Sequence, residues 1–262
     1  MYSNLKNKCV DAFVAYVGDE ATARTGEQLK AEPLVNKIVV VTTGNDLCGL
    51  DDCEVLHVNN RMCTSAFADI ADHVTTDYVL LCDAPAAVTF GYNAITRMVD
   101  CASNAEAFLT YCDYNVVKNG MVEHHPVIDA CKGSVRDDFD LGSVLLILAD
   151  EMRIYLEECK EYQHSCPYDF YLHCLEGVEY DDILHIKAYL YTEESIDLHQ
   201  IGERQFDYVD PRNRLVQIER EAVATAHIKS IGAAIDYKTI KSVDVAQGEF
   251  EFEASVIIPV RN

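Results

Sequence analysis

Three of the aspartates in this chain are candidates to bind a metal ion or to take a proton from a hydroxyl group. Asp83 follows the buried apolar run 77–82, and a carboxylate at such a strand end can bind Mg²⁺ or Mn²⁺ through oxygen. Asp138 lies in the segment Arg-Asp-Asp-Phe-Asp at 136–140, which is either a general base or acceptor-binding loop, or a solvated loop whose arginine pairs with an acid. Asp169 is either a general base or a carboxylate that faces water or caps a helix.

Alternating strands and helices in the first part of the chain would position these groups. Buried runs of β-branched residues predict strands, and apolar residues at helical spacing predict helices. Their alternation is typical of an α/β fold with a Rossmann-like, mostly parallel sheet flanked by helices. The expected strands are 10–17, 37–41, 54–58 and 77–82, and the expected helices are 20–32, 63–73 and 89–101.

The second part of the chain is less regular. The dipeptide Asn119-Gly120 predicts a tight turn between two hairpin strands. Asp210-Pro211 predicts the start of one long helix over 212–235. An apolar stripe on that helix packs either on its own sheet or on a neighbouring domain or subunit. The other expected elements are the hairpin strands 108–117 and 121–128, helices 150–162 and 167–175, and a strand over 183–191.

The chain ends on S-V-I-I-P-V-R-N at 255–262, a pattern that predicts a further buried strand. A strand needs neighbours in a sheet, so we expect a second domain to begin here. We therefore divide the chain into a first domain over 1–210, a long helix and connector over 211–250, and the first strand of a second domain over 251–262.

Several of these segments resemble motifs of the family 2 glycosyltransferases, which have the GT-A nucleotide-diphospho-sugar transferase fold. They are I-V-V-V-T-T-G at 38–44, D-Y-V-L-L-C-D-A-P at 77–85 and Y-D-F-Y-L-H at 168–173, while 255–262 resembles the family's opening strand. The resemblance extends over about residues 10–235 and implies the N-terminal domain of a bacterial tandem glycosyltransferase of polysaccharide synthesis. It implies a nucleotide-diphospho-sugar donor and a glycan or lipid-linked acceptor. The residues that it implies for the donor are Tyr16, Thr42, Thr43 and Asp83, with Mg²⁺ or Mn²⁺ at Asp83.

Three functional positions of that family carry other residues in this chain. Thr42-Thr43 stand in place of an acidic pair, Pro85 in place of the second aspartate of a D-x-D motif, and Cys166-Pro167 in place of a Glu-Asp pair. Asp83 alone remains where a divalent cation takes two or three carboxylates, which disfavours a metal site. Because the buried strands are retained and these charges are lost, we expect a domain that is degenerate at its catalytic motifs.

Two functions follow from these observations. The first is an enzyme that transfers a sugar from a nucleotide-diphospho-sugar to a glycan or lipid-linked acceptor. The second is a non-catalytic GT-A domain that acts as a scaffold, as a dimerisation element of a homo-oligomer, or as a glycan- or nucleotide-binding module for an active domain downstream.

Composition limits the partners and the cellular location. The 44 acidic and 21 basic residues give a net charge of −23, which disfavours nucleic acid as a ligand. No apolar run approaches the roughly 18 residues of a membrane span, and the first residues lack the apolar core of a secretory signal. The 11 cysteines include no C-x-x-C pair and are typical of reduced thiols. We therefore expect a cytoplasmic protein, which in its full-length form could be associated with a membrane.

Overall fold

The computed structural model describes residues 9–44, 53–176, 182–194 and 214–242. Within them, strands and helices alternate over the first part of the chain as the sequence predicts. The strands are β1 (Val10–Ala15), β2 (Val35–Thr42), β3 (Glu54–His57), β4 (Tyr78–Cys82), β5 (Val88–Phe90), β6 (Leu109–Lys118), β7 (Met121–His125), β8 (Val144–Leu148) and β9 (Ile183–Glu194). The helices are α1 (Asp19–Lys30), α2 (Thr64–His73), α3 (Ala94–Ala105), α4 (Ala149–Glu158), α5 (Cys166–Leu175) and α6 (Arg214–Ser230), followed by a 3₁₀ turn at Tyr237–Thr239.

The described strands form one nine-stranded sheet in the order β3-β2-β1-β4-β8-β6-β9-β5, with β7 paired to β6. Strands β3, β2, β1 and β4 are parallel, and Phe13 in β1 lies level with Val39 in β2 and Leu81 in β4. Strand β8 is antiparallel to both β4 and β6, while β6 and β9 are parallel. The carboxyl ends of β1, β2 and β4 therefore meet at one edge of the sheet.

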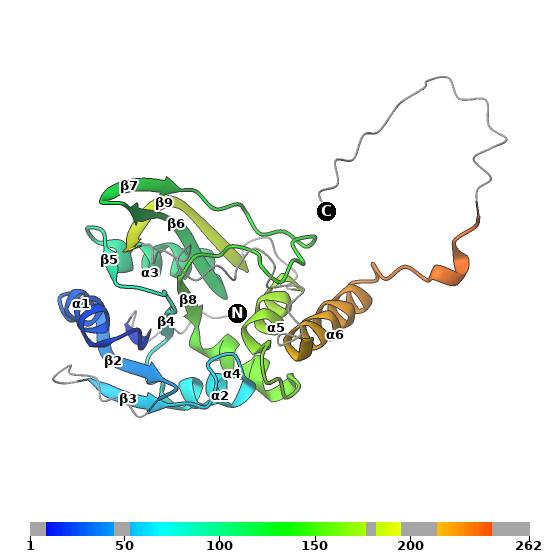
Figure 1. Cartoon of the computed structure of the whole chain (residues 1–262), viewed down its shortest axis with the longest axis horizontal. Coiled ribbons are helices and arrows are strands. Elements are labelled where there is room, and N and C mark those ends of the chain that lie inside the picture. The colour runs from blue at the N-terminus through cyan, green and yellow to red at the C-terminus, as the bar shows by residue number, and fades with distance from the viewer. Residues whose placement is uncertain (1–8, 45–52, 177–181, 195–213, 243–262) are drawn as a thin grey trace, which may run out of the picture.

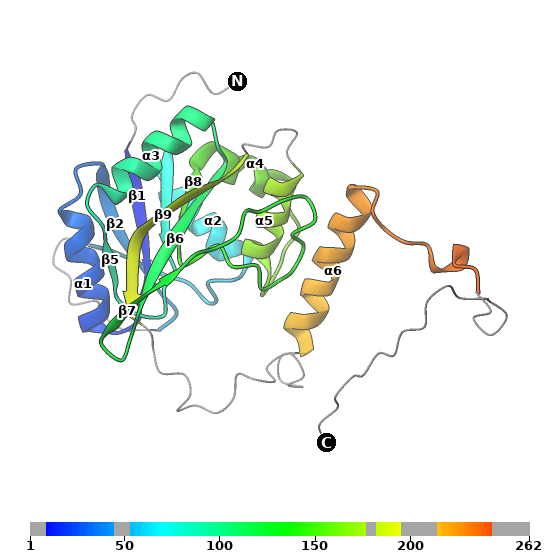
Figure 2. The same ribbon diagram turned by 90° about the horizontal axis from the view of Figure 1, so that it is seen from above.

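Helices cover both faces of the sheet, which gives three layers (Figures 1 and 2). Leu29 of α1 and Ile95 of α3 belong to the apolar cluster on one face. Phe67 of α2, Met152 of α4 and Phe170 of α5 belong to the cluster on the other face. Because alternate residues of a strand point to opposite faces, β1 supplies side chains to both clusters.

The structure corrects several sequence predictions about secondary structure. The helix expected over 150–162 ends at Glu158, and the strand expected over 121–128 ends at His125. The predicted helix over 89–101 begins only at Ala94, because Thr89 belongs to β5 and Asn93 has a left-handed φ of 54°. Strand β8 was not predicted. The long helix ends at Ser230 instead of 235, because Gly232 follows with a φ of 71° and closes the helix in the left-handed conformation.

The predicted hairpin turn is confirmed, since Asn119 and Gly120 both have positive φ, 52° and 76°, as a type I′ turn requires. The final segment 255–262 lies outside the described residues. Within the described part of the chain, no helix is long and apolar enough to cross a membrane.

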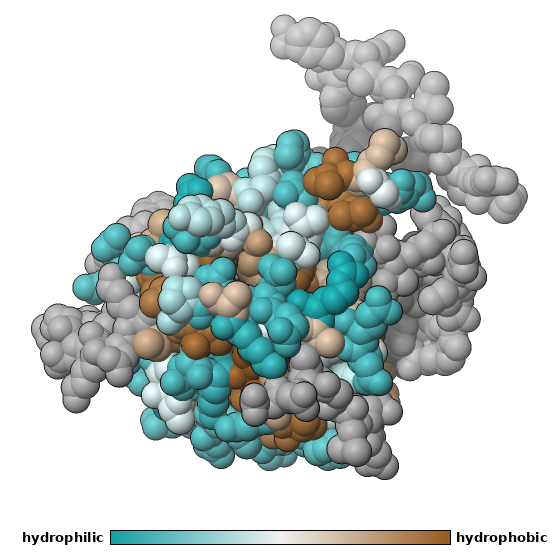
Figure 3. Space-filling view, turned by 90° about the vertical axis from the view of Figure 1, so that its left-hand side faces the viewer, coloured by the Kyte–Doolittle hydropathy of each residue, from teal (hydrophilic) through white to brown (hydrophobic). Residues whose placement is uncertain are grey.

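Helix α6 lies at the side of the molecule next to α5 (Figure 1). Only a narrow stripe of it is buried, with Val223 at 1% and His227 at 4% exposure, whereas Leu215 remains 71% exposed. The face of the molecule shown in Figure 3 is covered mostly by hydrophilic side chains, as the acidic composition leads one to expect.

Candidate functional site

A cavity of about 210 Å³ opens where β1, β2 and β4 end. Ala15 and Val41 form its wall at the ends of β1 and β2, and Asp83 lies directly after β4. Arg61, from the loop before α2, and Pro167 of α5 close it from the side. The edge beyond the carboxyl ends of parallel strands is the usual place for a ligand in an α/β sheet.

Arg61 and Asp83 form an ion pair inside this cavity. The distance from Nη1 of Arg61 to Oδ1 of Asp83 is 3.1 Å, and the two side chains are 34% and 44% exposed. The backbone N–H of Asp83 donates a 2.9 Å hydrogen bond to the carbonyl of Ser143, which fixes the end of β4 against β8. Partial burial raises the pKa of Asp83, and the guanidinium of Arg61 opposes this rise.

The loop that carries Arg61 is fixed by Asn60. Its side-chain oxygen accepts a 3.0 Å hydrogen bond from the N–H of Met62, and its amide donates a 2.6 Å hydrogen bond to the carbonyl of Gln163. Sequence reasoning did not select Arg61. The available signal was a basic residue directly before a predicted helix, after a short strand of a parallel sheet.

Tyr16 follows β1 directly, and Thr42 and Thr43 lie at the end of β2, so all three are at the same edge of the sheet, but none of them lines this cavity. The hydroxyl of Thr42 accepts a 3.1 Å hydrogen bond from the N–H of Gly44, so it stabilises the turn after β2. The hydroxyl of Tyr16 donates a 2.8 Å hydrogen bond to Asp19 at the start of α1. The cavity wall at these two strands is formed by the preceding residues, Ala15 and Val41.

A second cavity of about 590 Å³ adjoins the first, with which it shares Met62, Gly142, Leu145 and Pro167. Asp138 lies in its wall and accepts hydrogen bonds of 2.8 and 2.6 Å from Nε and Nη2 of Arg136. These bonds lower the pKa of Asp138. Arg220 of α6 reaches the same cavity and pairs with Asp137 at 3.0 Å.

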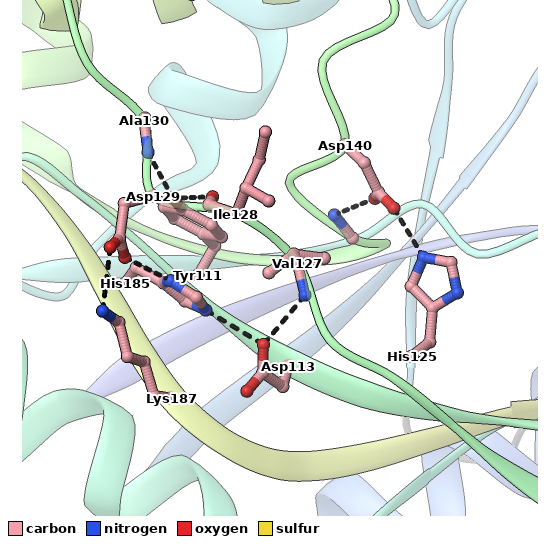
Figure 4. Close-up of polar contacts among 11 residues, drawn as sticks. Tyr111, Asp113, His125, Val127, Ile128, Asp129, Ala130, Asp140, His185 and Lys187 are labelled. Atoms are coloured by element: carbon pink, nitrogen blue, oxygen red, sulfur yellow. Dashed lines mark hydrogen bonds and ion pairs between the residues drawn. The ribbon is translucent and has the colours of Figure 1, made fainter.

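A partly buried polar network holds the start of the loop that carries Arg136, Asp137 and Asp138 (Figure 4). Asp113 of β6 accepts a 2.9 Å hydrogen bond from the N–H of Val127. The ring of His185 in β9 lies between two carboxylates, 3.0 Å from Asp113 and 2.7 Å from Asp129. Lys187 donates a 2.8 Å hydrogen bond to Asp129 from the exposed side.

Tyr111 adds the next anchor of the loop. Its hydroxyl accepts a 2.8 Å hydrogen bond from the N–H of Ala130 and donates a 2.7 Å bond to the carbonyl of Ile128. Its ring stacks on His185, with centroids 4.7 Å apart.

The far end of the loop is held by Asp140, which lies 2.7 Å from His125 and accepts a 2.9 Å hydrogen bond from the N–H of Gly142 (Figure 4). The loop 126–142 is therefore fixed against β6, β7 and β9 on one side of the second cavity.

Asp169 lies away from these cavities. Its two carboxylate oxygens each accept a 3.0 Å hydrogen bond, one from the hydroxyl of Tyr155 and one from that of Tyr162. Burial raises the pKa of Asp169, and these two hydrogen bonds oppose the rise. Asp169 lines a separate cavity of about 220 Å³, together with His173 and His227. Asp83 and Asp138 thus line two adjoining cavities, whereas Asp169 lines a separate one.

The groups around Asp83 do not fit a divalent cation. Asp83 faces a guanidinium, and the position two residues later is Pro85. Among the described residues, no three His, Cys, Asp or Glu side chains come together as a metal would need. Mg²⁺ and Mn²⁺ prefer several oxygen ligands, so one carboxylate that is already paired is a poor site.

Comparison with known proteins agrees with this architecture. No protein-family model and no curated protein matches the sequence. S. aureus TarS 1–349, solved in complex with UDP-GlcNAc, superposes with a TM-score of 0.56 at 11% identity. The match covers 84% of this chain and 66% of that chain, so this chain spans about two thirds of that relative.

Two further structures are similar to the same extent. Glucosyl-3-phosphoglycerate synthase from Mycobacterium tuberculosis, in complex with Mn²⁺, UDP-Glc and phosphoglyceric acid, gives a TM-score of 0.54 at 10% identity over 89% of this chain and 82% of that chain. Mannosyl-3-phosphoglycerate synthase from Rubrobacter xylanophilus gives 0.51 at 10% identity over 89% and 78%. The chain therefore has the α/β fold of the GT-A glycosyltransferases, as the sequence predicts.

Proposed function

We propose that this chain is a GT-A domain that binds a nucleotide-diphospho-sugar at the edge formed by β1, β2 and β4, and that its own transfer activity is weak or absent. The observation that carries the proposal is the pair of adjoining cavities at this edge. One lies where the strands end, and the other lies beside it under the loop 126–142. A donor and an acceptor need two such neighbouring sites.

The smaller cavity suits a nucleotide for two reasons. Its wall is largely apolar, with Phe13, Val41 and Leu145 among its residues, which suits the flat face of a base. Arg61 at its mouth carries a positive charge toward which a diphosphate can be drawn. The crystal structure of S. aureus TarS 1–349 contains UDP-GlcNAc, so a fold of this kind accommodates such a donor.

The larger cavity suits a glycan acceptor. Phe139 and Tyr171 stack with ring centroids 5.5 Å apart, and Tyr168 lies in the same wall. Aromatic rings combined with carboxylates and arginines provide both an apolar face and hydrogen-bond partners for sugar hydroxyls.

Weak activity follows from the groups available as a base. Pro167 lines both cavities where the resembled family has an acidic pair, and proline cannot accept a proton. Asp138, in the wall of the larger cavity, is the carboxylate that we assign to this role. Its two oxygens are held by Arg136, and its lowered pKa makes it a weaker base.

A second candidate function is a scaffold or dimerisation domain. It is favoured by α6, on which Leu215 is 71% and Ile218 is 51% exposed. Apolar residues exposed side by side on a helix are suited to contact with another domain or subunit. Sedimentation of the purified chain distinguishes the two, because a dimer that Leu215→Asp dissociates would support the scaffold.

The proposal is tested by measuring binding and turnover separately. We expect UDP-glucose or UDP-GlcNAc to bind saturably in calorimetry, while UDP release with glycan acceptors stays below about 1 s⁻¹, the low end for enzymes. Release within the usual range of enzymes would reject the degenerate domain, and Asp138→Asn would then show whether Asp138 is its base. No binding of either sugar nucleotide would reject the donor site.

A further inference from the structure

The smaller cavity contains few charged side chains. Among the described residues that line it, Arg61 and Asp83 alone are charged, and they face each other at 3.1 Å. A nucleotide diphosphate carries negative charge that must be neutralised on entering a largely apolar cavity. The guanidinium of Arg61 is therefore the one cation of this wall that can do so.

The position of Arg61 is built into the fold. Asn60 holds the preceding turn through hydrogen bonds to Met62 and Gln163, and Cys63 at the start of α2 is buried. The backbone of Asp83 is fixed to Ser143 of the neighbouring chain segment. Both charged groups therefore have defined places at the end of β4.

The pair can open without a large loss of stability. Both side chains are more than a third exposed, at 34% and 44%, and ion pairs with this exposure contribute little to folding. Arginine has five N–H donors in one plane, so Arg61 can turn part of its donor set toward phosphate oxygens.

We propose that Arg61 supplies the positive charge for a nucleotide diphosphate in this cavity, so that binding requires no divalent cation. The inference rests on the proposed donor site and adds to it which group binds the diphosphate. Asp83 then has a different role from that of a metal ligand: it holds Arg61 in place in the free protein, and its negative charge opposes the incoming diphosphate.

The two residues should consequently respond differently to substitution. Arg61→Ala removes the cation and should weaken binding about 10- to 100-fold, the effect of losing hydrogen bonds to a charged group. Arg61→Lys keeps the charge but loses the planar fork of donors, so its affinity should lie between that of the unchanged chain and that of Arg61→Ala. Asp83→Asn removes the repelling charge and should leave the affinity unchanged or increase it.

The experiment is calorimetric titration of UDP-glucose into the 262-residue chain, once with EDTA and once with Mn²⁺. Arg153→Ala is the matched control, because Arg153 also forms an exposed ion pair, with Asp150 on α4. Its guanidinium donates to the carbonyl of Val74, which precedes the amino end of β4, so it lies at the opposite edge of the sheet from the cavity. Thermal unfolding of each variant checks that it remains folded.

We expect equal affinity in EDTA and in Mn²⁺, a loss with Arg61→Ala and no change with Arg153→Ala. Binding that requires Mn²⁺ and disappears in Asp83→Asn would overturn this inference and leave the proposed donor site intact. Metal-free binding that Arg61→Ala does not weaken would also overturn it. Absence of binding in both buffers would reject the donor site itself.

Discussion

The hydroxyl of Tyr155 donates a 3.0 Å hydrogen bond to the carboxylate of Asp169. Asp169 lines a different cavity from the one that contains Asp83. Tyr162 donates to the other carboxylate oxygen at the same distance. Tyr155 is 2% and Tyr162 is 9% exposed, so Asp169 satisfies two buried hydroxyls between α4 and α5. This environment indicates a structural role.

Asp169→Ala should therefore lower the free energy of unfolding by about 2 kcal/mol, because it leaves the buried hydroxyl of Tyr162 without its acceptor and leaves that of Tyr155 with the longer, 3.3 Å bond to the carbonyl of Cys166. Tyr162→Phe removes a single hydrogen bond and should cost about 1 kcal/mol. Urea unfolding measures both, and calorimetry with UDP-glucose should give the same affinity as for the unchanged chain. If Asp169→Ala abolishes sugar-nucleotide binding or turnover while stability is retained, Asp169 acts in the site.

Gly142 is required where the two cavities meet. Its φ is +77°, and an added Cβ would overlap with the hydroxyl of Tyr191, which accepts a 2.7 Å hydrogen bond from the N–H of Ser143. We expect Gly142→Ala to destabilise the chain by roughly 1–3 kcal/mol through the strained backbone and this overlap.

Gly133 provides the matched control, since it lies in the same loop and an added Cβ there has nothing within 4 Å. Gly133→Ala should change the thermal unfolding temperature little. Equal effects of the two substitutions would show that the backbone at Gly142 can adjust to a side chain, and that the contact with Tyr191 does not fix the backbone where the two cavities meet.

Stability should depend on the protonation of His173. Glu151, which is 5% exposed, lies 2.9 Å from Nε2 of His173 and raises the pKa of this histidine. The folded chain therefore binds this proton more tightly than the unfolded chain. The resulting stabilisation is complete below the ordinary histidine pKa of about 6.5 and is lost as the pH rises through the raised value.

Urea unfolding at pH 6 and pH 8.5 tests this dependence. We expect the unchanged chain to be less stable at pH 8.5, and His173→Gln to remove most of the difference. His57→Gln, on the exposed edge strand β3, is the control and should preserve it. A pH dependence that His173→Gln leaves intact would assign the effect to another group.

The loop 126–142 should depend on Asp113 more than on Asp129. Asp113 accepts from Val127 and lies 3.0 Å from Nε2 of His185, whose ring is buried, so Asp113→Ala leaves the N–H of Val127 and Nε2 of His185 without this partner, while Nδ1 of His185 keeps Asp129. A loss of roughly 3 kcal/mol is expected for breaking a buried pair. Asp129 is 61% exposed, and Asp129→Ala should have a much smaller effect. Hydrogen exchange of the amides of 126–142 would detect the loosened loop, and equal protection in both variants would contradict the assigned anchor.

The sequence predicted most of the sheet because its central strands are continuous apolar runs. Strands β1, β2 and β4 all lie where such runs occur, and turn residues bound them. Strand β8 could not be separated from the following helix in the sequence, because its last residue, Leu148, is followed directly by Ala149 of α4. No Gly or Pro separates the strand from the helix, so the two form one apolar stretch.

The candidate site was predicted in part. Asp83 could be placed at a strand end from local sequence, because the preceding residues are buried and β-forming. Its pairing with Arg61 could not be predicted, since the ion pair joins a loop to the residue that follows β4, 22 positions later, and depends on how α2 packs. The separation of Asp169 from Asp83 is likewise a consequence of tertiary packing, because α5 turns that carboxylate toward α4.

The most direct test of the account is a titration of UDP into the chain and into Met62→Trp. Met62 lies in the wall of both cavities, so a larger side chain there should fill the space between them. We predict one saturable site in the unchanged chain and at least tenfold weaker binding in Met62→Trp. No saturable binding, or equal affinity in the two proteins, would contradict a nucleotide site at the edge formed by β1, β2 and β4.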